Sequence, residues 1–313
     1  MGKLYQVPDR RLQTSIATKP IFNLQSSILN LQSLAFLMLL PALVFGQYLI
    51  TTPDSLMTNR ADYLVVTHSA FTNAMYPLCR LRESLGLEVK MAEVGLIYSA
   101  FTSGPRTDRI KAFMRQVYDH WERRPTYVLL VGDASKDSTT GQDFVPVKLF
   151  NKFSYSYWGG LTVHGIDNWY AQLERQDSIP DIIIGRLPVN SAARCESLVS
   201  KIIRYETAPD TGAWVHRALL TSSNDRDAYA VHMDTFFLHP NYDSVYRVHE
   251  SDGNTAFLRQ KMRAGFNLGV ALACAVTHGN QPPVWLGSKT IFSYQDVDSL
   301  RNLDCLPVVL GRG

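Results

Sequence analysis

From Asp62 onward, short apolar runs alternate with segments in which apolar residues recur every three or four positions. The runs at residues 63–67 and 127–133 have the length and composition of strands that are buried on both faces. The segment between Ile110 and Trp121 places its apolar side chains on one face of a helix. A strand–helix–strand series of this kind predicts right-handed crossovers and a mostly parallel sheet covered by helices on both faces. The predicted fold class is therefore α/β.

The same alternation continues along the chain. Further strands are predicted at residues 88–94, 181–189, 217–222, 244–249, 270–276 and 306–310, and further helices at 71–85, 192–205, 228–238 and 255–263. Residues 134–180, which precede the strand at 181–189, show neither the strand nor the helix periodicity, so a long loop is predicted there. The stretch 208–212, which contains Pro and Gly, separates two α/β series. We therefore expect a linker at 47–61 and two subdomains, at 62–210 and 211–313.

The first 46 residues have the pattern of an export signal. Residues 1–27 are polar and basic, and an uncharged apolar run follows at 34–45, just before Gly46. This run is too short for a comfortable membrane span and matches the apolar core of a signal peptide. We predict export through this signal peptide (1–46), to the medium or the cell envelope, with an uncleaved N-terminal anchor as the alternative. No later segment is apolar enough to span a bilayer, so no membrane partner is expected for the mature form.

Composition argues against several classes of function. The formal net charge is +3 and the basic residues are scattered, so a nucleic-acid partner is not expected. The sequence contains no glycine-rich motif for a dinucleotide or a nucleoside triphosphate. Its four cysteines lie far apart and show no C-x-x-C spacing, which argues against a zinc ribbon and a dithiol redox site; they are Cys79, Cys195, Cys274 and Cys305.

One apolar run ends close to a histidine, a residue type that can act in catalysis. Residues 270–276 are followed by Thr277, His278 and Gly279. Side chains at the carboxyl ends of strands in open α/β sheets lie in the crevice where such folds bind ligands. On this stretch alone, a catalytic histidine and a loop histidine both remain open. Asp133 ends the strand at 127–133 in a similar way, and there the capping of a turn is the commoner role.

Several segments, taken in order, resemble the gingipain-like cysteine peptidases. They are DYLVVTH (62–68), PTYVLLVGDAS (125–135), IDNWY (166–170), PDIIIGRLPV (180–189), KIIRYE (201–206) and THG (277–279). This family has the caspase fold and includes the sortase of the type IX secretion system. The resemblance implies a caspase-like α/β/α sandwich with mostly parallel sheets and two subdomains. It also implies a cysteine endopeptidase that acts on protein or peptide substrates.

The resemblance assigns roles to particular residues. His278 matches the catalytic histidine, and the backbone N–H of Gly279 is suited to stabilise an oxyanion. Asp225 stands about where the family has an acidic residue near this histidine, with a helix N-cap as its alternative role. No cofactor is required for this chemistry. Calcium binding occurs in the family, but the sequence assigns no metal ligands.

The family's nucleophilic cysteine follows the strand predicted at 306–310. In this sequence that position falls at or after Gly313, whereas Cys305 precedes the strand. We therefore expect a C-terminally truncated domain that holds the histidine of a Cys–His dyad and is inactive as written. The alternatives are a non-catalytic binding or secretion-accessory module on the same fold, and a type IX sortase-like enzyme.

Overall fold

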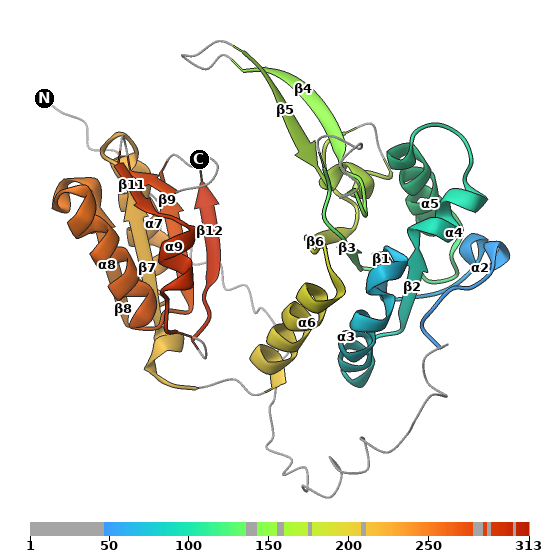
Figure 1. Ribbon diagram of the computed structural model, residues 1–313, viewed down its shortest axis with the longest axis horizontal. Helices are drawn as coiled ribbons and strands as arrows, with labels where there is room; N and C mark the ends of the chain where they lie inside the picture. The colour runs from blue at the N-terminus through green and yellow to red at the C-terminus, as the bar shows by residue number, and fades with distance from the viewer. Residues whose placement is uncertain are drawn as a thin grey trace, which may run out of the picture. The chain divides into compact units, whose positions relative to one another are not determined.

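Two four-stranded sheets organise the computed structural model, which describes residues 47–135, 143–154, 160–174, 177–207, 211–277, 284–286, 289–302 and 305–312 (Figure 1). The first sheet has the strand order β2-β1-β3-β6 and the second the order β12-β9-β7-β8. Every pairing within the two sheets is parallel. The strands of the first sheet are β1 (Tyr63–Thr67), β2 (Val89–Glu93), β3 (Tyr127–Val131) and β6 (Ile183–Leu187), and those of the second are β7 (Arg217–Ser222), β8 (Ser244–His249), β9 (Leu272–Val276) and β12 (Val308–Arg312).

Helices cover both faces of the first sheet. Along β1, Leu64 and Val66 belong to one apolar cluster and Val65 to another, and all three side chains are fully buried. Because neighbouring residues of a strand point to opposite faces, an uninterrupted apolar run requires cover on both. The first cluster contains residues of α2 (Pro53–Met57), α4 (Val94–Ala100) and α5 (Arg106–His120), and the second contains residues of α3 (Thr72–Ser84) and α6 (Ala192–Thr207).

The second sheet is built in the same way. Leu219 of β7 packs with Leu258 and Met262 of α8 (Thr255–Asn267), whereas Leu220 packs with Ala230 of α7 (Asp227–Met233). A short π-helix at Asp234–Leu238 continues α7, and its Leu238 packs in the cluster that contains Leu220 and Ala230. The predicted α/β class, with mostly parallel sheets between helices, is confirmed.

The prediction of one long loop at 134–180 is wrong. This region contains an antiparallel hairpin of β4 (Lys148–Ser154) and β5 (Gly160–Ile166), followed by a 3₁₀ turn at Asn168–Ala171. A two-stranded ribbon needs no apolar run buried on both faces, so its strands lack the signal that marks β1 or β3. A second hairpin of β10 (Val284–Leu286) and β11 (Lys289–Phe292), and the helix α9 (Tyr294–Asp298), were also not predicted.

Residues 47–61, expected to be a linker, contribute to the core. Tyr48, Ile50 and Leu56 are each at most 4% exposed. Main-chain hydrogen bonds join Ile50 N to Met91 O and Met91 N to Tyr48 O, both at 2.8 Å, so this segment lies beside β2. The predicted signal peptide at 1–46 lies outside the described residues. None of the helices in the described part of the chain has the length and apolar character needed to cross a membrane.

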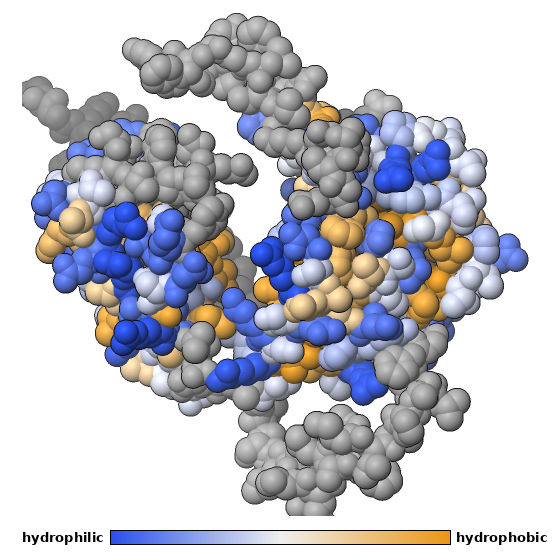
Figure 2. Space-filling model, in the orientation of Figure 1, coloured by the Kyte–Doolittle hydropathy of each residue, from blue (hydrophilic) through white to orange (hydrophobic). Residues whose placement is uncertain are grey.

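Hydrophobic side chains also reach the surface at β12, an edge strand of the second sheet. Val308, Val309 and Leu310 are 54%, 61% and 52% exposed. Figure 2 shows hydrophobic residues at the surface where Figure 1 places this strand. An edge strand with this composition offers backbone and apolar surface to a further segment.

A buried carboxylate holds α9 against α8. Asp296 is 1% exposed, and it accepts hydrogen bonds from Ser293 N and from Arg259 Nη2, both at 2.8 Å. Burial by itself raises the pKa of Asp296, but the hydrogen bonds from Ser293 and the charge of Arg259 outweigh this effect and hold the pKa below its ordinary value. The ionised carboxylate therefore stabilises this corner of the fold.

We expect Asp296→Asn to lower the free energy of unfolding at pH 7 by about 1–3 kcal/mol. Because the pKa in the folded state lies below that in the unfolded state, this stabilisation is present above about pH 4 and is lost as the pH falls through the folded-state pKa. Urea unfolding at pH 7 and pH 3 measures the difference, with Asp298→Asn on the exposed end of α9 as the matched control. An equal loss at both pH values would contradict the assignment.

Candidate active site

The four strands of the second sheet end at the same level. In the parallel register, Ser222 of β7 pairs with Val276 of β9 and with His249 of β8, and Val276 pairs with Arg312 of β12. The residues that follow these strands therefore share one edge of the sheet. This edge is where open α/β sheets place their ligand sites.

The predicted histidine comes directly after one of these strands. His278 and Gly279 lie outside the described residues, but the chain leading to them is described as far as Thr277, which is 4% exposed. A main-chain hydrogen bond of 3.3 Å from Ser223 N to Val276 O joins the chain after β7 to the end of β9. The segments that follow β7 and β9 thus begin side by side.

Asp225 lies on the segment that follows β7. It belongs to a 3₁₀ turn, Asn224–Arg226, and its Oδ1 accepts a 2.6 Å hydrogen bond from Oγ of Ser223, which is fully buried. Arg226 Nε lies 3.4 Å from the other carboxylate oxygen. Arg226, and not Asp225, occupies the N-cap position of α7, so the alternative role of Asp225 as a helix N-cap is wrong. The carboxylate is instead held at the carboxyl edge of the sheet.

Two further residues at this edge were missed by sequence reasoning. His249, the last residue of β8, belongs to no sequence motif, yet only 27% of its side chain is exposed, and its Nε2 lies 3.1 Å from Oδ1 of Asp227. The two residues are far apart in the sequence and belong to different elements, so no spacing pattern could reveal the contact.

Three of the four thiols are poorly suited to be nucleophiles. Cys79, Cys195 and Cys274 are buried. Burial raises the pKa of Cys79 to about 12 and that of Cys195 to about 11, and it also raises the pKa of Cys274. Because the thiolate is the reactive form, these side chains act as core residues.

Cys305 lies at the opposite end of the second sheet. It precedes β12, and a Cβ built on Gly269, just before β9, would approach the Cys305 Sγ to 3.3 Å. Since β9 has five residues, the amino and carboxyl edges are separated by about 16 Å at ~3.3 Å per residue. This distance separates the Cys305 thiol from the end of β9, the strand that leads to His278.

We therefore expect Cys305→Ala to leave any peptidase activity of the protein within about twofold of wild type, because a thiol at the amino edge of the sheet takes no part in acyl transfer at the carboxyl edge. Cleavage of a fluorogenic peptide, with circular dichroism to check folding, measures the effect. A folded Cys305→Ala variant without activity would show that this cysteine is the nucleophile.

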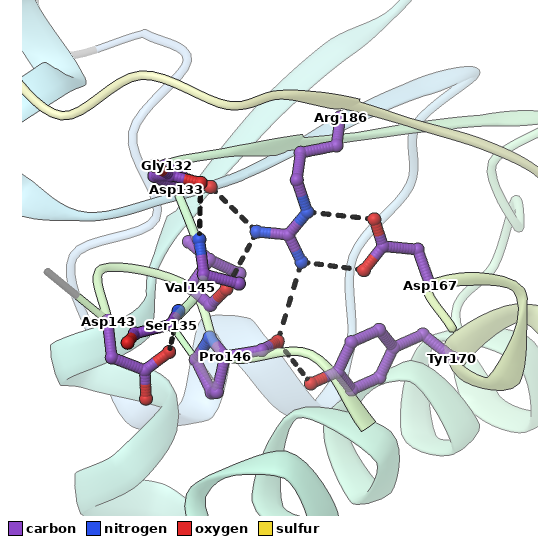
Figure 3. Close-up of polar contacts among 10 residues, drawn as sticks. Gly132, Asp133, Ser135, Asp143, Val145, Pro146, Asp167, Tyr170 and Arg186 are labelled. Atoms are coloured by element: carbon purple, nitrogen blue, oxygen red, sulfur yellow. Dashed lines mark hydrogen bonds and ion pairs between the residues drawn. The ribbon is translucent and has the colours of Figure 1, made fainter. Parts of the chain in front are cut away.

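A second polar cluster lies at the carboxyl edge of the first sheet (Figure 3). Nε and Nη2 of Arg186, in β6, donate to the two carboxylate oxygens of Asp167 at 2.8 and 2.7 Å. Nη1 donates to the carbonyls of Gly132 and Val145 at 2.6 and 2.7 Å, and Nη2 has a 3.4 Å contact with the carbonyl of Pro146. The guanidinium is occupied by protein oxygens, so this cluster is structural rather than a ligand site.

Asp133 belongs to the same region. Its Oδ1 accepts from Ala134 N at 2.9 Å, and its main-chain oxygen accepts from Phe144 N at 3.0 Å. The carboxylate is thus bonded to the main chain directly after β3, which is compatible with the expected capping of a turn. Among the described residues, no group of three or more His, Cys, Asp or Glu side chains is placed to hold a metal ion.

Comparison with known proteins agrees with this architecture. The model of peptidase family C25 matches residues 57–313. The chain belongs to peptidase family C25. This is a family of cysteine peptidases, the gingipain family, so the predicted family is confirmed. The search of curated protein sequences gives no match.

Solved structures show the same C25 fold. The complex of the pro- and mature domains of RgpB from Porphyromonas gingivalis has 20% sequence identity and a TM-score of 0.64, over 80% of this chain and 55% of that one. A crystal structure of the Arg-specific cysteine proteinase gingipain R (RgpB) has 19% identity and a TM-score of 0.64, over 84% and 56% of the two chains. This C25 chain thus spans about half the length of the structures it matches.

Proposed function

We propose that this chain carries the histidine half of the active site of an exported cysteine endopeptidase. The observation that supports the proposal is the common level at which β7, β9 and β12 end, with Asp225 held after β7 and His278 following β9. The stretch that follows β12 is the place for the nucleophile, because Arg312 pairs with Val276 only two residues before His278.

In this proposal His278 takes the proton from the cysteine thiol, and the thiolate attacks the scissile carbonyl carbon. The backbone N–H of Gly279 donates to the oxyanion that forms on the carbonyl oxygen. His278 then returns the proton to the leaving amine, and water hydrolyses the thioester. Asp225, on the neighbouring segment, orients the imidazole and stabilises its protonated form.

The proposed chemistry requires no cofactor. Calcium enters only as a proposal from the family resemblance, and the described residues offer no acidic cluster that fits it. No step is therefore assigned to a metal. The proposed substrates are proteins or peptides, met after export through the signal peptide at 1–46. The preferred residue at the cleavage site is left open.

A non-catalytic binding module on the same fold is the second candidate. It is favoured by the placement of the thiols, since three are buried with a raised pKa and Cys305 lies at the far edge. A type IX sortase-like enzyme would share the dyad and differ in its substrate.

An assay of the full-length gene product distinguishes these candidates. We expect cleavage of fluorescent casein that is abolished by iodoacetamide and by replacement of a cysteine following β12, whereas residues 1–313 alone are inactive. Cleavage by residues 1–313 that is lost on Cys305→Ala would overturn the proposed dyad. A folded full-length product with no hydrolytic or transpeptidase activity would favour the binding module.

A further inference from the structure

The segment that carries Asp225 is fastened to the end of β8 on both sides. On one side, Asn224 N donates to Oε2 of Glu250 at 2.9 Å. On the other side, Oδ1 of Asp227 lies 3.1 Å from Nε2 of His249. Asp225 stands between these two contacts, so the end of β8 helps to fix the backbone on which Asp225 lies.

The His249 ring is held in a defined orientation. Its Nδ1 accepts from Ser251 N at 3.2 Å and lies 2.7 Å from Ser251 Oγ. This acceptor role leaves the proton of the neutral ring on Nε2. Nε2 is buried, yet its N–H is not aligned on any acceptor, Asp227 included. The contact with Asp227 is therefore mainly electrostatic, and a positive charge on the ring strengthens it.

The other charged groups around the ring have hydrogen bonds or ion pairs that do not involve Nε2. Asp252 accepts from His249 N at 2.8 Å and from Lys261 Nζ at 2.6 Å, while Arg247 and Asp234 form an ion pair. A cavity of about 100 Å³ separates α7 from the ends of β7 and β8. The charged groups that face this corner are Asp225, Arg226, Asp227, Asp234, Arg247, Glu250, Asp252 and Lys261. Within this set, Asp227 is the carboxylate that faces Nε2.

We propose that His249 is a pH-dependent positioning residue, whose protonated ring holds Asp227 and with it the segment that carries Asp225. The support that Asp225 gives to His278 is then strongest at mildly acidic pH and weakens as His249 loses its proton. The consequence for catalysis rests on the proposed function, whereas the contact itself does not.

The contact is tested by NMR on residues 1–313. The backbone amides of residues 224–227 are expected to shift between pH 5 and pH 8 with the same midpoint as the ring resonances of His249. His249→Gln removes this titration, and the matched variant His232→Gln, on the exposed side of α7, preserves it. Amides that do not follow His249, or that still titrate in His249→Gln, overturn the inference.

The consequence for catalysis is tested by measuring kcat/KM of the full-length protein. Variant and wild type are compared at the same pH, so that any effect of pH on His278 is common to both and cancels in their ratio. His249→Gln is expected to lower kcat/KM about fivefold at pH 6, the equivalent of a modest ion pair, and to leave it nearly unchanged at pH 8. Asp227→Asn should give the same loss of kcat/KM. The double variant, with both substitutions, should lose no more than either single variant. An equal loss at both pH values overturns the positioning role. An inactive wild type whose amides still titrate defeats the proposed function and leaves the contact established.

Discussion

If the proposed dyad operates, replacing His278 by alanine is expected to lower kcat/KM for peptide cleavage by about a thousandfold or more. The imidazole is assigned two proton transfers, one from the thiol and one to the leaving amine, and general acid–base catalysis contributes about 10²–10⁴-fold. Initial rates of peptide cleavage measure the loss, and circular dichroism with a thermal melt establishes that the variant is folded.

Two control variants show how large the loss of kcat/KM in His278→Ala is by comparison. Asp225→Asn keeps the size of the side chain and removes its charge, so we expect a loss of about tenfold, as for an orienting group rather than a proton carrier. His232→Ala changes a histidine on α7 whose ring lies tilted against that of Phe236, and it should leave kcat/KM within about twofold of wild type, since surface changes are usually mild. A folded His278→Ala variant with more than a tenth of wild-type activity would remove His278 from the dyad.

Arg186→Met is expected to lower the free energy of unfolding by about 3 kcal/mol, the largest stability effect predicted for the chain. The arginine side chain is 11% exposed, and its loss leaves the carboxylate of Asp167 and the carbonyls of Gly132 and Val145 without their donor. Methionine retains most of the apolar volume, so the change isolates the missing hydrogen bonds. Urea unfolding at pH 7, followed by tryptophan fluorescence, gives the difference.

Arg115→Met is the matched control. Arg115 also pairs with an aspartate, Asp119 at 3.5 Å, but both side chains are about half exposed on the surface of α5. An exposed pair one helical turn apart contributes about 0.3–0.5 kcal/mol. If the two methionine variants were equally stable, the Arg186 cluster would contribute no more than a surface ion pair.

The strands that could be predicted from sequence are those whose own residue pattern shows that both of their faces are covered. A strand that is buried on both faces carries an apolar run, and for this reason the bounds of β7 were predicted without error. The hairpin of β4 and β5 depends on pairing between two irregular runs, and neither run carries that information alone. The position of His278 after β9 could be inferred because a strand end specifies an edge of the sheet.

Side-chain partners that come from different elements could not be inferred. The contact of His249 with Asp227 requires the parallel register of β7 and β8, which the sequence does not state. Arg186 falls within an apolar strand pattern, where a charged residue signals only that some partner exists. Its partner, Asp167, lies in the region that was predicted as a loop, so the ion pair was not predicted.

Because β9 and β12 end at the same level, an insertion within either strand would displace the proposed site. A site that is carried by a loop is less sensitive to such an insertion. One extra residue within β12 would turn every later side chain to the opposite face of the sheet, and two would restore the face but displace the following segment by about 7 Å. Evolution of this region is therefore restricted to substitutions along the strand. Variation in length is expected to fall instead on the connections at the amino edge of this sheet.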